Sequence, residues 1–174
     1  GPVIAVLGLG NVLMGDDAFG PYVIACLEAH YEFPAGVELI DAGTPGHELS
    51  VHLEGRDAAV VVDAVGATGE PGAVILYEGD EVIRRPLPAV ASSHEPGLRD
   101  ALLSLAFCGR GPGRTLLVGV IPGSVELGTG LSGPVLRAVP EAERAVVEWL
   151  SRFGVAVHPK NPPDKPSIWW EAAP

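Results

Sequence analysis

The chain has 174 residues, 47% of them hydrophobic and 19% charged, which are proportions of one folded domain rather than of a disordered chain. Its formal net charge of −11 argues against nucleic acid or an anionic membrane as a partner, because both attract Lys and Arg. Two isolated cysteines favour a reducing cytoplasm, and no apolar run approaches the roughly 20 residues that span a bilayer. We therefore expect a cytoplasmic protein without a signal peptide, and we interpret Gly1-Pro2 as a tag-cleavage scar.

Strand and helix patterns alternate along the chain. The apolar run Val3–Leu9 predicts a strand buried on both faces, and Pro21 fits the first turn of a helix that extends to Tyr31. The other predicted strands, in chain order, are Val37–Ile40, Ala58–Val62, Ala73–Tyr77, Leu116–Ile121 and a short edge strand at Val155–Val157. The other predicted helices are His47–Leu53, Leu98–Leu105 and Pro134–Phe153, and Gly79–Gly97 is predicted to be a loop.

This order of elements predicts the fold class. It is that of an α/β three-layer sandwich, with a mostly parallel twisted sheet, one antiparallel strand and helices on both faces. Residues 3–158 would form a single domain, and residues 159–174 a Pro-rich C-terminal tail. We expect this tail to be a loosely ordered or foreign end, because termini are commonly mobile. Its paired Trp169 and Trp170 leave a docking peptide as the alternative.

The turn after the first predicted strand carries an unusual combination of residues. An apolar strand that enters Gly8-Leu9-Gly10 is the usual start of a nucleotide-binding unit, in which a helix N-terminus faces a phosphate. Here Leu13 takes the place of the third glycine, and the helix opens with Asp16 and Asp17. These carboxylates would repel a pyrophosphate but suit a cation. The turn therefore predicts a cation or acid-base site rather than a dinucleotide site.

Two more acids end the next predicted strands. If the first three long strands pair in the order 2-1-3, then Asp41, Asp63 and the Asp16-Asp17 pair lie along one rim of the sheet, where open α/β sheets carry their sites. Asp63 follows four apolar residues, so a partner is needed for its charge at the edge of the core. Asp41 is either part of the site or simply an organiser of the turn that follows it.

His94 adds an imidazole from a polar loop before a predicted helix. Two carboxylates and one imidazole, with open positions left over, suit a transition metal better than Ca²⁺ or Mg²⁺. A serine nucleophile is disfavoured, because Ser93 is the sequence neighbour of His94 and no Gly-x-Ser-x-Gly elbow is present. Cys26 falls on the apolar face of the first helix and is predicted to be core, while Cys108 shows no activating partner.

Taken together, five segments resemble the [NiFe]-hydrogenase maturation endopeptidases: Gly8–Gly20, Asp41–Leu49, Val62-Asp63-Ala64, Ser93–Leu98 and Leu117–Pro122. They follow in order within a resemblance that runs from about Val3 to Val157 and leaves the tail outside. The first motif and the Asp-x-Gly-Thr-x-Gly motif are specific in combination. The resemblance implies a cytoplasmic protease that removes the C-terminal peptide of a hydrogenase large-subunit precursor after nickel insertion.

The resemblance also implies roles for individual residues. The metal contacts of the family carry over to Asp17, Asp63 and His94, and family members have either Asp or Glu at the first of these positions. Asp41 corresponds to the acid of the Gly-Thr motif, and either Asp16 or Asp41 is our candidate general base. The nickel would be carried by the substrate, although another divalent metal could occupy the site in isolation. We expect a monomer, with substrate bound by Gly43, Thr44, Gly46 and His47.

Three other interpretations stay open. A nickel-independent hydrolase would use Asp16 and Asp41 as an acid-base pair, and it would still process precursor depleted of nickel. A nucleotide or small-ligand binding module would hold a ribose with Asp41, and nucleotide would then stabilise it against heat. A non-catalytic protein would bind the nickel-loaded precursor without shortening it.

Overall fold

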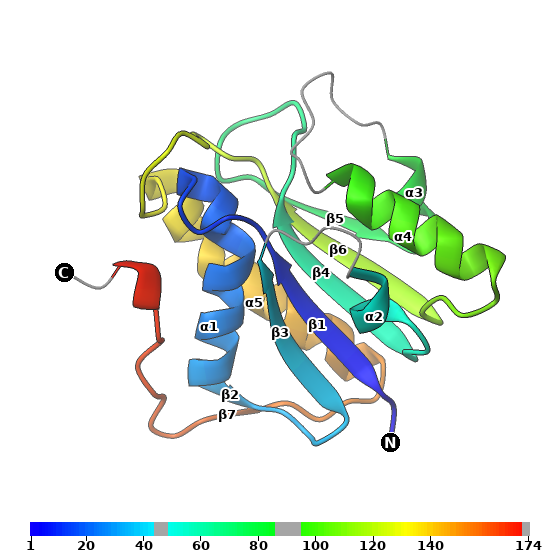
Figure 1. Ribbon diagram of the computed structural model, residues 1–174. Helices are drawn as coiled ribbons and strands as arrows, with labels where there is room; N and C mark the ends of the chain where they lie inside the picture. Colours follow the sequence, from blue (N-terminus) through cyan, green and yellow to red (C-terminus); the bar gives the residue numbers. More distant parts are fainter. Residues whose placement is uncertain (44–48, 86–94, 172–174) are drawn as a thin grey trace.

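A five-stranded sheet forms the centre of the computed structural model, which describes residues 1–43, 49–85 and 95–171 (Figure 1). The strand order is β3-β1-β4-β6-β5; β5 runs antiparallel to β6, and the other neighbours are parallel. The strands span β1 (Ile4–Leu9), β3 (Val37–Gly43), β4 (Ala58–Ala64), β5 (Val74–Glu78) and β6 (Arg114–Val120). The predicted mostly parallel sheet, its antiparallel strand and the 2-1-3 order of the first three long strands are thus confirmed.

Helices cover both faces of this sheet (Figure 1). One face carries α1 (Phe19–His30) and α5 (Gly133–Arg152), and the other carries α2 (Leu49–Leu53), α3 (Asp80–Arg84) and α4 (Glu95–Phe107). Alternation along β4 builds the two clusters, since Val60 packs with α1 and α5 while Val61 packs with α2 and α4. The predicted three-layer sandwich is confirmed, and burial on both faces explains the unbroken apolar runs of the central strands.

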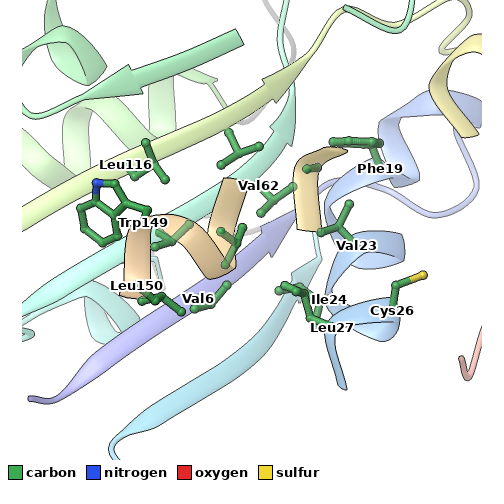
Figure 2. Close-up of a cluster of buried hydrophobic side chains, with 14 of the residues drawn as sticks. Val6, Phe19, Val23, Ile24, Cys26, Leu27, Val62, Leu116, Trp149 and Leu150 are labelled. Atoms are coloured by element: carbon green, nitrogen blue, oxygen red, sulfur yellow. The ribbon is translucent and has the colours of Figure 1, made fainter. Parts of the chain in front are cut away.

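The larger hydrophobic cluster lies between the sheet and helices α1 and α5. Figure 2 shows Phe19 and Val23 of α1 beside Val62 of the sheet, with Trp149 of α5 near the other end of the cluster. Cys26 is buried in the same cluster, as predicted, whereas Cys108 is exposed. This packing fixes α1 against β1 and β4, two of the three strands whose ends carry the predicted site.

Helix α1 lies very close to the sheet because two glycines meet there. A Cβ atom added to Gly20 would lie 2.3 Å from the carbonyl oxygen of Leu9, and one added to Gly8 would lie 2.5 Å from the carbonyl oxygen of Gly20. Only glycine permits such an approach of two backbones. The contact holds the 3-10 helix η1 (Gly15–Ala18), which immediately precedes α1, at the carboxyl end of β1.

Two local predictions were wrong. The stretch predicted as a loop from Gly79 to Gly97 contains α3 and the first turn of α4, and residues 86–94 lie outside the described part. Val155–Val157 forms no strand; instead β7 (His158–Pro159) pairs antiparallel with β2 (Tyr31–Glu32) in a separate two-stranded sheet. The strand prediction failed because these valines are apolar for core packing and not for strand pairing: Val155 is buried directly after α5.

The C-terminal tail is docked on the domain, which corrects the expectation of a loosely ordered end. It lies alongside α1 in Figure 1 and ends in the 3-10 helix η2 (Trp169–Glu171). At the C-terminal end of α1, the Lys160 ammonium donates to the carbonyl oxygen of Glu28 at 2.8 Å, and the Lys160 backbone N–H donates to that of His30 at 2.8 Å. A cation beside the last carbonyls of a helix is favourable, and this explains where the tail attaches.

Candidate active site

Three strand ends bring the predicted acids to one rim of the sheet. Strand β1 lies between β3 and β4, and Gly8 pairs with Asp41 on one side and with Val62 on the other. Asp41 and Asp63 therefore flank the end of β1, with their backbones about 10 Å apart, since neighbouring strands are roughly 4.8 Å apart. The η1 turn, which carries Asp16 and Asp17, follows the same end of β1 and contacts β4.

Asp63 is fully buried and belongs to the face of the sheet that α4 covers. Alternation along β4 puts Asp63 on the side of Val61, whose cluster includes the buried face of α4. Helix α4 begins at Glu95, the residue directly after His94. His94 itself lies outside the described residues, so its role as a metal contact together with Asp17 and Asp63 stays a prediction.

Asp17 is nearly buried, and the first glycine-rich turn is shaped around it. One of its carboxylate oxygens, Oδ2, accepts a hydrogen bond from the backbone N–H of Asn11 at 2.8 Å. Gly10 has a φ of +138°, and a Cβ atom there would lie 1.7 Å from the backbone carbonyl oxygen of Asp17. The glycine therefore makes room for the acidic turn rather than for a phosphate. Its N–H also donates to the carbonyl oxygen of Gly43 at 2.7 Å, which ties this turn to the end of β3.

Asp16 is fully buried and accepts hydrogen bonds from both ends of the loop between β6 and α5. Its carboxylate accepts four hydrogen bonds: from the N–H groups of Gly123 (2.7 Å), Ser124 (3.0 Å) and Ser132 (2.7 Å), and from the Ser132 hydroxyl (2.7 Å). These donors stabilise the ionised carboxylate and occupy both oxygens. The arrangement favours a positioning role for Asp16 over its predicted alternative as general base. Sequence reasoning missed these partners, although Ser132 stands at the N-cap position of α5.

Asp41 is exposed at the end of β3. Its Oδ1 accepts the backbone N–H of Gly43 at 3.0 Å, which is the turn-organising bond that the sequence left as an alternative. Gly43 has a φ of +60°, a conformation that favours glycine. The remaining predicted substrate-binding residues, Thr44, Gly46 and His47, lie outside the described residues, so their role stays a prediction.

The metal-binding prediction is also left open by the geometry. Within residues 1–43, 49–85 and 95–171 no group of three His, Cys, Asp or Glu side chains is arranged to hold a metal ion. The predicted trio includes His94, which is outside those ranges. In the same part of the chain, no helix has the length and apolar character needed to cross a membrane.

A hollow at the opposite end of the sheet, near the amino ends of β4 and β6, is a weaker candidate for the active site than the acidic rim. It has a volume of about 730 Å³ and is lined by Arg56, Arg110 and Arg114 among others. Two of these guanidinium groups already have carboxylate partners, Arg56 with Glu38 at 2.7 Å and Arg110 with Glu54 at 2.8 Å. Of these two places, the acidic rim at the carboxyl ends of β1, β3 and β4 is therefore the better candidate for the active site.

The fold and the rim define an α/β protein with an acidic site at the carboxyl ends of its parallel strands, and comparisons with known proteins are specific about its family. A family model for the hydrogenase maturation proteases matches residues 21–149. The hydrogenase 2 maturation protease of Escherichia coli (strain K12) is 37% identical over 163 residues, which cover 91% of this chain and 96% of that protein. The hydrogenase expression/formation protein HoxM of Azotobacter vinelandii is 38% identical over 155 residues, covering 88% and 75%.

The fold itself is shared with a solved structure. The hydrogenase maturating endopeptidase HybD from E. coli superimposes with a TM-score of 0.84 at 36% identity, covering 91% of this chain and 98% of that one. The chain belongs to the hydrogenase maturation protease family. It is therefore a peptidase, that is, a hydrolase, as the resemblance of its motifs implied.

Proposed function

We propose that this peptidase removes a C-terminal peptide from the large-subunit precursor of a [NiFe]-hydrogenase once nickel has been inserted. The observation that carries the proposal is the rim itself, where Asp17, Asp41 and Asp63 end or follow three adjacent strands of a fold that HybD shares. Acidic side chains at this edge suit a substrate that presents both a peptide bond and a metal ion. The names of the relatives point to the same class of substrate.

Nickel is here part of the substrate, and its recognition falls to Asp17, Asp63 and His94. Two carboxylates and one imidazole can occupy coordination positions that the assembled precursor leaves open. Asp63 and Asp17 are both buried at the rim, and Asp17 Oδ2 accepts the Asn11 N–H at 2.8 Å, so the surrounding structure holds both carboxylates in position. A precursor without nickel would offer these carboxylates no cation and would bind less well.

Peptide hydrolysis requires a water molecule next to the scissile carbonyl group and a base that accepts its proton. Asp41 is our candidate for that base, since it is exposed at the rim, whereas Asp16 is fully buried with donors on both oxygens. The water oxygen would bond to the scissile carbonyl carbon while one of its protons passes to Asp41; the C–N bond would then break, and Asp41 would pass that proton to the leaving amine. Gly43, Thr44, Gly46 and His47 would bind the peptide beside this base.

Substitution of the proposed nickel contacts tests the assignment. Asp17→Ala or His94→Ala should slow processing of the nickel-loaded precursor by at least about 10-fold, because the loss of even a residue that supports a metal ligand costs about 10-fold to 100-fold. Asp80→Ala and His158→Ala are matched controls, because both residues are exposed and belong to other parts of the fold. Processing at the native rate by either Asp17→Ala or His94→Ala would overturn the assignment.

A further inference from the structure

The loop between β6 and α5 is fixed to the acidic turn along its length. The Asp16 carboxylate holds residues at both ends of the loop through Ser124 and Ser132. Between them, the Gly128 N–H donates to the carbonyl oxygen of Leu13 at 2.8 Å, and the Gly15 N–H donates to that of Gly128 at 2.8 Å. Residues 121–132 are therefore fixed by hydrogen bonds to residues 11–17, and the two segments form one surface at the carboxyl end of β1 (Figure 1).

Exposed apolar side chains lie along the seam between residues 11–17 and residues 121–132. Met14 and Gly128 form an isolated parallel bridge, and Leu13 and Leu127 are the residues that directly precede them on the two bridged segments. Leu13 is 51% exposed and Leu127 is 82% exposed, and Val125 is exposed two residues away. Single exposed leucines are ordinary on protein surfaces, but here two lie on segments that are hydrogen-bonded to each other and fixed by a buried carboxylate, so their backbone positions are set before a partner binds.

The proposed substrate needs such a contact. A folded protein partner that binds specifically buries about 800 Å² on each side, which is far more than a nickel ion and one peptide bond can offer. Apolar side chains on a rigid support beside the site are the groups that add affinity at low entropic cost. The seam meets this need because it is built on the turn that carries Asp17.

We propose that Leu13, Leu127 and Val125 form a docking surface for an apolar face of the hydrogenase large-subunit precursor, next to the segment to be cleaved. The proposal rests on the proposed function above and assigns it a contact outside the acidic rim. The surface supplies binding that does not change during the reaction. Its loss should therefore raise KM and leave kcat in place.

The test measures processing of nickel-loaded precursor by the Leu13→Ser/Leu127→Ser double variant over a range of precursor concentrations. We expect KM to rise about tenfold, as for the loss of an interface hot spot, with kcat within about twofold of wild type. Phe107→Ser is the matched control. Phe107 is 93% exposed at the end of α4, and the chain then enters β6 at its amino end, which is the end of the sheet opposite the acidic rim. The single variant Leu127→Ser is measured as well, because Leu127 is 82% exposed and its replacement should leave the fold intact even if the double variant misfolds. Leu127→Met keeps an apolar side chain and should have the native KM.

The outcomes separate this proposal from the proposed function. Wild-type protein that processes the precursor, together with a double variant of unchanged KM, would overturn the docking surface and leave the function intact. No processing by wild type would count against the function itself. A wild-type dimer in light scattering that becomes monomeric in the double variant, with KM unchanged, would assign the surface to a second copy of this chain and also overturn the proposal.

Discussion

Asp16 and Asp41 lie at the same rim of the sheet in opposite surroundings. Asp16 is fully buried among four donors from the loop that follows β6, and Asp41 is exposed at the end of β3. A buried carboxylate that is the shared acceptor for a loop determines where that loop lies. The exposed carboxylate of Asp41 is accessible to a water molecule. We therefore propose different roles for the two acids, positioning for Asp16 and proton transfer for Asp41.

Asparagine substitutions at both positions distinguish these roles. Asp41→Asn should lower kcat by about 100-fold or more with little change in stability, because it removes the proposed proton acceptor. Asp16→Asn should lower the free energy of unfolding by about 1–3 kcal/mol, because an amide group would face donors with its own N–H group. Processing assays and urea denaturation of both variants give the answer. An Asp16→Asn protein of native stability without activity would make Asp16 the base.

The two thiols of the chain should differ strongly in reactivity. Burial, with a further contribution from the charge of Glu143, raises the pKa of the Cys26 thiol to about 12, whereas Cys108 is exposed. At pH 8 iodoacetamide should alkylate Cys108 readily and Cys26 only after denaturation, because the thiolate is the reacting form. Mass spectrometry of the modified peptides measures both rates. Equal rates in the folded protein would contradict the buried position of Cys26.

The same shift has a consequence for stability at alkaline pH. The pKa of Cys26 is higher in the folded than in the unfolded chain, where the ordinary value is 9.0. The contribution of the neutral buried thiol is thus complete below about pH 9 and is lost as the pH rises toward 12. Cys26→Ala should remove this alkaline loss, whereas Cys108→Ala should retain it. Urea denaturation between pH 8 and pH 11 would show the difference.

Among the structural elements, the tail is the one whose role changes most once the fold is known. Trp170 is 8% exposed and meets the ring of Tyr22 on α1 edge to face, with centroids 6.3 Å apart, while Trp169 is 64% exposed. Trp170→Ala should therefore cost about 3 kcal/mol of unfolding free energy, and Trp169→Ala less than about 0.5 kcal/mol. Urea denaturation of the two variants measures both. Equal small losses would show that the tail does not stabilise the domain in solution.

The elements that could be predicted are those whose pattern is local. An unbroken apolar run such as β1 has one stable environment, between two layers of helices, so its sequence predicts both strand and burial. Helix α5 is predicted equally well, because apolar residues on one stripe face the sheet along its whole length. The acids at the rim follow from these strands, since parallel strands end together.

What could not be predicted depends on contacts between distant segments. The tail has no periodicity of its own and is placed by Lys160 at the end of α1. The Asp16 carboxylate accepts hydrogen bonds from Gly123 and Ser132, which lie more than a hundred positions further along the chain. Glu143, buried on α5, is matched by His30 of α1, whose Nδ1 lies 2.6 Å from its Oε1. No spacing rule along the chain predicts which segments will meet in this way.

At the scale of the whole molecule, one edge of the sheet gathers the features that the proposed function requires. The acids lie there because the parallel strands end there, and the loop from β6 to α5 adds an apolar surface beside them. The opposite edge carries arginines that are partly paired with glutamates. A partner that presents a metal ion and an apolar face would therefore be directed to one end of the molecule.

Nickel-dependent cleavage can be measured by intact-mass spectrometry of the hydrogenase large-subunit precursor after incubation with this protein. The precursor is prepared in two forms, loaded with nickel and free of it, and both are incubated under the same conditions. We expect loss of a C-terminal peptide from the loaded form and an unchanged mass for the nickel-free form. Equal shortening of both forms would contradict the role of nickel in recognition, and no shortening of the loaded form would contradict the proposed activity.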